Sequence, residues 1–84
     1  MHYKKQYISL DANETKQVSL SSASMIIINS NNNHNFIWVG VLRWNDLQEI
    51  KATGTIPAIS GANGVLSLKN ETSSTMYINI MTIG

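Results

Sequence analysis

The chain has few of the residue types that small proteins commonly need for stability or chemistry. Its 84 residues include a single proline and no cysteine, so no disulfide can stabilise the fold. Charged residues make up only 13% of the sequence, and six basic against five acidic residues give a formal charge of +1. This balance argues against a nucleic-acid-binding protein or one attracted to an anionic membrane, because either would carry a basic stripe.

Long hydrophobic runs are also missing. A membrane-spanning helix needs roughly 18 apolar residues, and the longest run here, residues 36–44, is interrupted by Arg43. The N-terminal segment 1–5 has basic residues but no apolar stretch behind them, which argues against a secretory signal peptide. We therefore expect no membrane insertion, and export, if any, by cell lysis or within an assembled particle.

Residues that could build a catalytic or metal site are present but scattered. His34 has no second histidine or carboxylate at ligand spacing, and no Gly-x-Ser-x-Gly or phosphate-binding glycine loop occurs. A glycosidase needs two carboxylates facing each other across a cleft. The spacing brings no two of the five carboxylates together: Asp11, Glu14, Asp46, Glu49 and Glu71. We expect no enzyme, no metal and no cofactor.

What the chain has instead is β-strand pattern. Short segments of alternating or β-branched residues are separated by turns rich in Asn, Ser and Gly, and ten Asn with ten Ser supply most of the polarity. The expected strands are residues 3–10, 16–20, 25–29, 36–44, 65–69 and 76–83. The segment 55–60 contains Pro57 and is expected to be an edge strand or an extended connection. Residues 61–64 are expected to form a turn, with Asn63-Gly64 as its strongest signal. The pattern predicts one domain over residues 1–84, an all-β antiparallel sandwich or small barrel.

The segment after Trp44 allows two interpretations. Asn45 and Asp46 could form a two-residue turn that returns residues 47–53 as a strand, with Arg43 opposite Gln48. Alternatively, Asp46 caps a short helix that ends at Gly54. We favour the strand, because the surrounding sequence is β-structure throughout.

Three strands are apolar on both faces, which is unusual for a sandwich that buries one face of each sheet. In the strand 36–44, one face carries Phe36, Trp38, Leu42 and Trp44 and the other is almost equally apolar. A second cover is needed, and another copy of the chain is the usual one. We predict a homo-oligomer with its interface at Ile27, Ile37, Val39, Val41, Tyr77, Met81 and Ile83.

Three segments resemble the C-terminal tip modules of bacteriophage tail fibres and tail spikes. Residues 10–20 are similar to their opening strand pair, residues 25–30 to the apolar second strand, and residues 64–81 to the closing hairpin. The resemblance implies a trimeric, jelly-roll-like β-sandwich in a virion, extracellular after release, that binds a host-surface glycan or receptor. The sequence departs from that pattern in being very short and without the fibrous shaft that normally precedes the tip, so we expect either that the shaft has been left out or that this is a small free-standing particle protein.

Two polar segments flank the strand 36–44 and are the candidate ligand-binding residues. Amide groups before it and a turn with an aromatic ring after it could contact a sugar. These residues are Asn31, Asn32, Asn33, His34, Asn35, Trp44, Asn45 and Asp46. The alternatives are a purely structural role as an oligomerisation, connector or capsid-decoration protein whose partners are other virion proteins, and a host-interaction protein using an exposed sheet edge.

Overall fold

The chain folds as a small antiparallel β-sandwich, in a computed structural model that describes residues 3–20, 23–30 and 35–84. The described residues contain eight strands and no helix, which confirms the all-β prediction. The strands are β1 (Tyr3–Leu10), β2 (Thr15–Ser19), β3 (Ala23–Ser30), β4 (Phe36–Arg43), β5 (Asp46–Gly54), β6 (Ala58–Ala62), β7 (Val65–Lys69) and β8 (Met76–Ile83).

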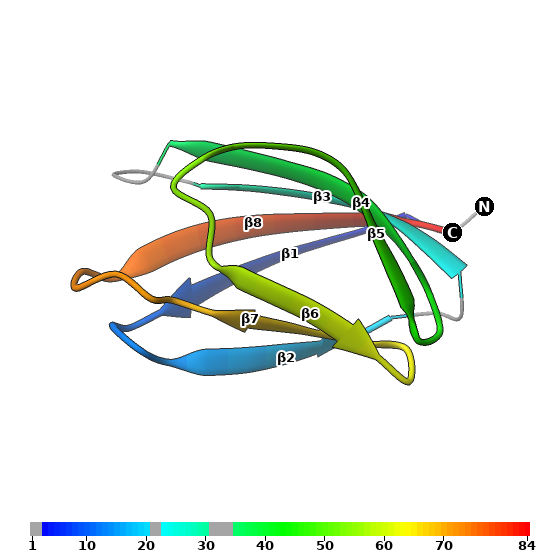
Figure 1. The fold of residues 1–84 in the computed structure, drawn as a ribbon, viewed down its shortest axis with the longest axis horizontal. Coiled ribbons are helices and arrows are strands. Elements are labelled where there is room, and N and C mark those ends of the chain that lie inside the picture. Colours follow the sequence, from blue (N-terminus) through cyan, green and yellow to red (C-terminus); the bar gives the residue numbers. More distant parts are fainter. Residues whose placement is uncertain (1–2, 21–22, 31–34) are drawn as a thin grey trace.

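Two sheets of unequal width form the sandwich (Figure 1). The wider sheet has the order β1-β8-β3-β4-β5, and the narrower sheet has the order β2-β7-β6. First and last strands pair, and so do the second and second-to-last, which is the nested, jelly-roll-like part of the topology. The middle of the chain departs from full nesting, because β3, β4 and β5 pair with their sequence neighbours.

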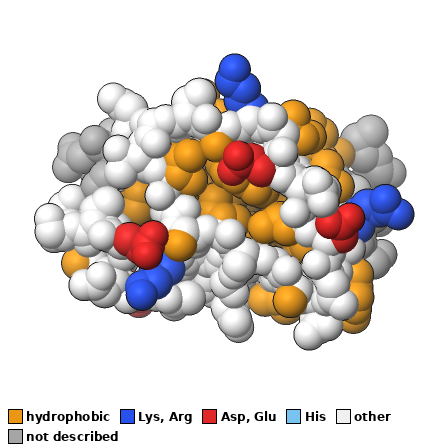
Figure 2. Space-filling model, viewed as in Figure 1, with side chains coloured by type: hydrophobic (Ala, Val, Ile, Leu, Met, Phe, Trp, Pro, Cys, Tyr) orange, Lys and Arg blue, Asp and Glu red, His pale blue; other side chains and the backbone are white. Residues whose placement is uncertain are grey.

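Alternating residues of both sheets meet in one hydrophobic core, as period-two patterning requires. The buried apolar residues are Leu10, Val18, Ile26, Ile28, Phe36, Trp38, Leu42, Leu66, Leu68, Met76, Ile78 and Ile80. Between the edge strands β5 and β6, partly buried side chains such as Leu47 and Ile59 pack against this core. Hydrophobic side chains form a band across the face of the molecule that Figure 2 shows.

Residues 46–53 form a strand, as favoured, but the predicted register of the hairpin was wrong. The turn consists of Trp44 and Asn45, so Arg43 lies opposite Asp46 instead of Gln48. This register places Leu42 directly opposite Leu47 against the core. Trp44 takes a φ of 55° in the turn. The alternation had predicted Trp44 on the buried face of the strand. Instead, the residue lies in the turn, outside the strand.

The segment around Pro57 confirms the predicted edge position, because β6 begins directly after this proline and is the outer strand of the narrow sheet. The expected turn at residues 61–64 is shorter than predicted. Gly61 and Ala62 still belong to β6, and only Asn63 and Gly64 form the turn. Both have positive φ angles, 55° and 72°, which is the backbone that an Asn-Gly hairpin favours.

Trp38 lies on β4, next to the edge strand β5 of the wide sheet. Its ring lies over Gly40, where a Cβ would be 2.3 Å from a ring carbon, so no larger residue fits at this position. The indole Nε1–H donates to the Oε1 of Glu49 at 2.8 Å. Beside this contact, Ile50 forms a bulge in β5 and has no partner on β4. The tryptophan therefore fills the space above a glycine while its polar atom is satisfied at the sheet edge.

Asn70 connects the two sheets at one end of the sandwich. It is fully buried, and its side-chain amide donates to the carbonyls of Leu10 (2.9 Å) and Ser74 (2.7 Å). Its side-chain oxygen accepts bonds from the backbone N–H and hydroxyl of Thr72. Its backbone bonds to Asn13 and Glu14 in the β1–β2 turn. This network joins the β1–β2 and β7–β8 turns, so Asn70 holds the two sheets together.

Candidate functional site

The predicted ligand-binding residues that the structure describes lie in two separate places. Asn35 is exposed just before β4, whereas Trp44, Asn45 and Asp46 follow at the other end of this strand. Eight residues in extended conformation separate the two groups by roughly 25 Å. Asn31, Asn32, Asn33 and His34 lie outside the described residues.

Trp44 and Asn45 contact a second turn. The backbone N–H of Asn63 donates to the side-chain oxygen of Asn45 at 2.6 Å, and the N–H of Gly64 donates to the carbonyl of Trp44 at 3.1 Å. The Trp44 ring lies against Gly64, yet 53% of the residue is exposed. The turn between β4 and β5 is thus held on the turn between β6 and β7, and the indole has a structural contact as well as a free side.

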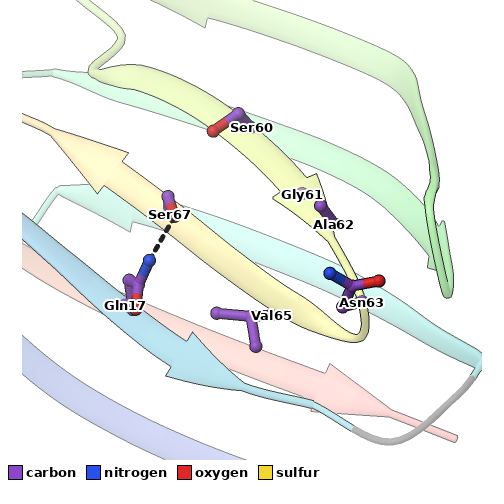
Figure 3. Close-up of a pocket in the computed structure, with 7 residues that line it drawn as sticks. All are labelled: Gln17, Ser60, Gly61, Ala62, Asn63, Val65 and Ser67. Carbon is purple, nitrogen blue, oxygen red and sulfur yellow. Dashed lines mark hydrogen bonds between the residues drawn. The ribbon is translucent and has the colours of Figure 1, made fainter.

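The outer face of the narrow sheet is polar and carries short side chains. We call it the polar face; it consists of Thr15, Gln17, Ser19, Ala58, Ser60, Ala62, Val65, Ser67 and Lys69. A shallow hollow of about 290 Å³ lies on this face, between its middle row and the β6–β7 turn (Figure 3). There the amide of Gln17 donates to the hydroxyl of Ser67 at 3.4 Å, and Asn63 lines one end. Pattern reasoning missed this hollow, because it arises where β2 pairs with the β6–β7 hairpin, which is distant from β2 in sequence.

The outer face of the wide sheet has the opposite character. The strand register aligns its side chains in rows across β1, β8, β3 and β4. We call this surface the apolar face; its ten apolar residues are Tyr3, Tyr7, Met25, Ile27, Ile37, Val39, Val41, Tyr77, Met81 and Ile83. The same register places four polar residues among them: Lys5, Ser9, Asn29 and Asn79. All seven residues of the predicted oligomer interface belong to it. Tyr3, Tyr7 and Met25 were not predicted, although the alternation of β1 and β3 places them on the same side.

The apolar face exposes a large area of apolar side chains to solvent. Tyr3, Tyr7 and Ile37 are 61%, 56% and 51% exposed, and Met25 is 41% exposed. These four side chains alone present roughly 400 Å² of accessible surface, taking about 200 Å² for each in full. The six partly buried members of the face add to this. The total reaches the size of the largest apolar patches on soluble monomers, about 300–600 Å², and such patches are often interaction sites.

Side chains that could act in catalysis are engaged in local structure. Glu14 accepts a bond from the backbone of Asp11, Glu49 accepts from Trp38, and Asp46 accepts from Gln48. Within the described ranges, no three His, Asp or Glu side chains gather where they could hold a metal ion. No helix among the described residues is long and apolar enough to cross a membrane.

Comparison of the chain with models of protein families, with curated proteins and with solved structures found no match. The two outer faces and the pair of turns at Trp44 are therefore interpreted from their own chemistry.

Proposed function

We propose that this protein is a non-enzymatic assembly module that works as a homo-oligomer, with the apolar face as its subunit contact. The observation that carries the proposal is the ten-residue apolar face itself, which no segment among the described residues covers. Leaving such a surface in water is unfavourable by about 25 cal/mol for each Å². Covering it with another subunit removes this cost.

The sequence pattern supports placing the module in a phage-type virion. The similarity to tail-fibre tip modules and the amide- and hydroxyl-rich composition support a particle protein whose neighbours are other virion proteins. The resemblance also implies a trimer, a finer statement that the apolar face alone does not require. The structural role, as an oligomerisation, connector or decoration protein, is the one that the geometry supports best.

The test is the molar mass in solution of the full chain and of two matched variants. Ile27→Asp adds a charge at the centre of the apolar face, and Ser67→Asp adds the same charge at the centre of the polar face. We expect an oligomer for the unmodified chain and for Ser67→Asp. For Ile27→Asp we expect a folded monomer, because a buried unpaired charge costs about 3–5 kcal/mol. Light scattering that gives a monomer for the unmodified chain would overturn the proposal.

A second candidate function is attachment to a host-surface glycan, and the hollow on the polar face favours it. Gln17, Ser67 and Asn63 offer amide and hydroxyl groups there, and Lys69 is the one charged residue of that face. Such a lining suits a neutral sugar, whose hydroxyls both donate and accept hydrogen bonds. The half-exposed Trp44 is joined to Asn63 through the paired turns.

A glycan array separates this candidate from a purely structural role. Binding that is lost in Gln17→Ala and retained in Ser9→Ala, on the opposite sheet, would support attachment at the polar face. Binding lost in Trp44→Ala alone would place the sugar at the turn instead. Absence of binding to every glycan would leave the structural role as the function.

A further inference from the structure

The side chains of the apolar face are arranged almost symmetrically about one line. This line runs parallel to the strands, between the neighbouring strands β8 and β3. The two strands on one side of it are β8 and β1, and the two on the other side are β3 and β4. We infer that the apolar face binds a second copy of this chain through a two-fold axis along this line. The inference rests on the proposed function and specifies its partner and symmetry.

The fifth strand supports this choice of axis. The outer residues of β5 opposite the apolar rows are Gln48, Lys51 and Thr53, all polar and exposed. A four-stranded contact centred between β8 and β3 leaves β5 outside and its polar groups in water. A contact centred on β3, the middle strand of all five, would instead bury Lys51 against the second copy. The apolar region is therefore four strands wide, and its midline is the proposed axis.

A half-turn about this axis brings most apolar residues of the face onto apolar residues of the second copy. Each row of side chains crosses β1, β8, β3 and β4 in this order. The half-turn places the same row of the second copy opposite it in the reverse order, so the facing residues follow from the observed register. Ile83 faces Met25 of the second copy, and Met81 faces Ile27. On the outer strands, Tyr3 faces Val41 and Tyr7 faces Ile37. Facing sheets pack about 10 Å apart, a distance that these side chains fill from both sides.

One polar pair lies within the apolar face, and it lies beside the axis. Asn79 and Asn29 are direct cross-strand neighbours, and the amide of Asn79 donates to the side-chain oxygen of Asn29 at 3.1 Å. Amides enclosed in an interface need hydrogen-bond partners. In the two-fold arrangement Asn79 faces Asn29 of the second copy, so two such pairs meet and satisfy each other. A single polar group in an apolar contact commonly fixes register.

The size of the face also fits a second copy. Four strands at about 4.8 Å spacing, each eight residues long, outline on the order of 500 Å². The relief of the side chains brings the accessible area toward the roughly 800 Å² that each partner loses in a standard interface. Lys5 lies on the outermost strand of the contact, where it faces Val39 of the second copy and is diagonal to Lys51 of that copy. Both ammonium groups can extend past the rim into water.

Mixing two charge variants tests the arrangement. Ile27→Glu and Met81→Lys each place one charge in the contact, and each should weaken self-association by about a hundredfold or more. In an equal mixture, the introduced carboxylate of one chain faces the introduced ammonium group of the other, and association should recover by at least about tenfold. The control is Ile27→Glu mixed with Val41→Lys, which faces Tyr3 and should give no recovery. Sedimentation velocity measures all of these mixtures, and circular dichroism checks that each variant folds.

The outcomes separate the inference from the proposed function. If the unmodified chain is monomeric, both the two-fold contact and the proposed function are wrong. If the oligomer has the mass of a trimer, or if association does not recover in the mixture, the two-fold contact is wrong and the proposed function still stands.

The salt dependence of binding tests the class of partner. Screening of the rim lysines should strengthen the pairing of two copies, whereas attraction to vesicles of anionic lipid would weaken with salt. Vesicle binding that falls with salt, without self-association, would overturn the choice of a second copy.

Discussion

The two outer faces of this sandwich are built by the same kind of strand but have opposite surfaces. On the wide sheet, the residues of β8, β3 and β4 that point away from the core are mostly Ile, Val, Met and Tyr, with Asn29 and Asn79 among them. On the narrow sheet, the corresponding residues are mostly Ser, Thr, Gln and Ala. The inner residues of both sheets form one hydrophobic core and are required for the fold in both. The difference between the outer residues therefore carries information about contacts outside the chain, and not about the fold.

Removing the Asn70 network should have the largest effect, because both faces depend on it. In Asn70→Ala the buried carbonyl of Leu10 loses its donor, and the carbonyl of Ser74 keeps only the bond from the Thr72 hydroxyl. The two bonds that Thr72 donates to the Asn70 side chain are lost as well. We expect the free energy of unfolding to fall by about 3 kcal/mol. Asn45→Ala is the control at the other end of the sandwich, where one exposed bond is lost. Urea unfolding of both variants gives the comparison, and equal effects would contradict the role of Asn70.

Making the apolar face uniformly apolar should change specificity more than affinity. In the double variant Asn29→Val and Asn79→Val, the amide pair is replaced by side chains that fit many registers. We expect association to persist or tighten, while the single species gives way to several. Sedimentation velocity should show a broadened distribution. A single sharp species of unchanged mass would mean that the amide pair does not fix the register.

Shortening Trp44 should have the smallest effect and distinguishes the turn from both faces. Trp44→Ala removes the ring that lies against Gly64 but leaves the backbone bond between these residues. We expect the free energy of unfolding to fall by about 1 kcal/mol, since half of the ring is already in water. The molar mass should stay the same. Dissociation of the oligomer in this variant would show that the turn belongs to the subunit contact.

Much of the fold could be predicted from the sequence because strand alternation is a local signal. The strands 65–69 and 76–83 have the predicted bounds, and Asn63-Gly64 forms the expected turn. The register of the β4–β5 hairpin could not be predicted, since it depends on Leu42 meeting Leu47 across the sheet. The burial of Asn70 was also missed, because an Asn in a polar turn has the same local pattern whether its amide is exposed or enclosed.

The candidate sites show the same limit. The apolar face was predictable in kind, since both sides of three strands are apolar. Its extent to Tyr3 and Tyr7 depends on β1 pairing with β8, a contact between the two ends of the chain. The hollow on the polar face likewise requires β2, β6 and β7 to lie side by side. Pairings between distant segments are not encoded in local pattern, so surfaces that combine them appear only in the fold.

The most direct test of the central claim is sedimentation equilibrium of the unmodified chain over a range of concentrations. If the apolar face is a subunit contact, the weight-average mass should stay above that of one chain down to about micromolar concentration, the weak end for an interface of this size. The two-fold contact further predicts a limiting mass of two chains. A single 9.3 kDa species at all concentrations, with a sharp thermal transition, would contradict the claim.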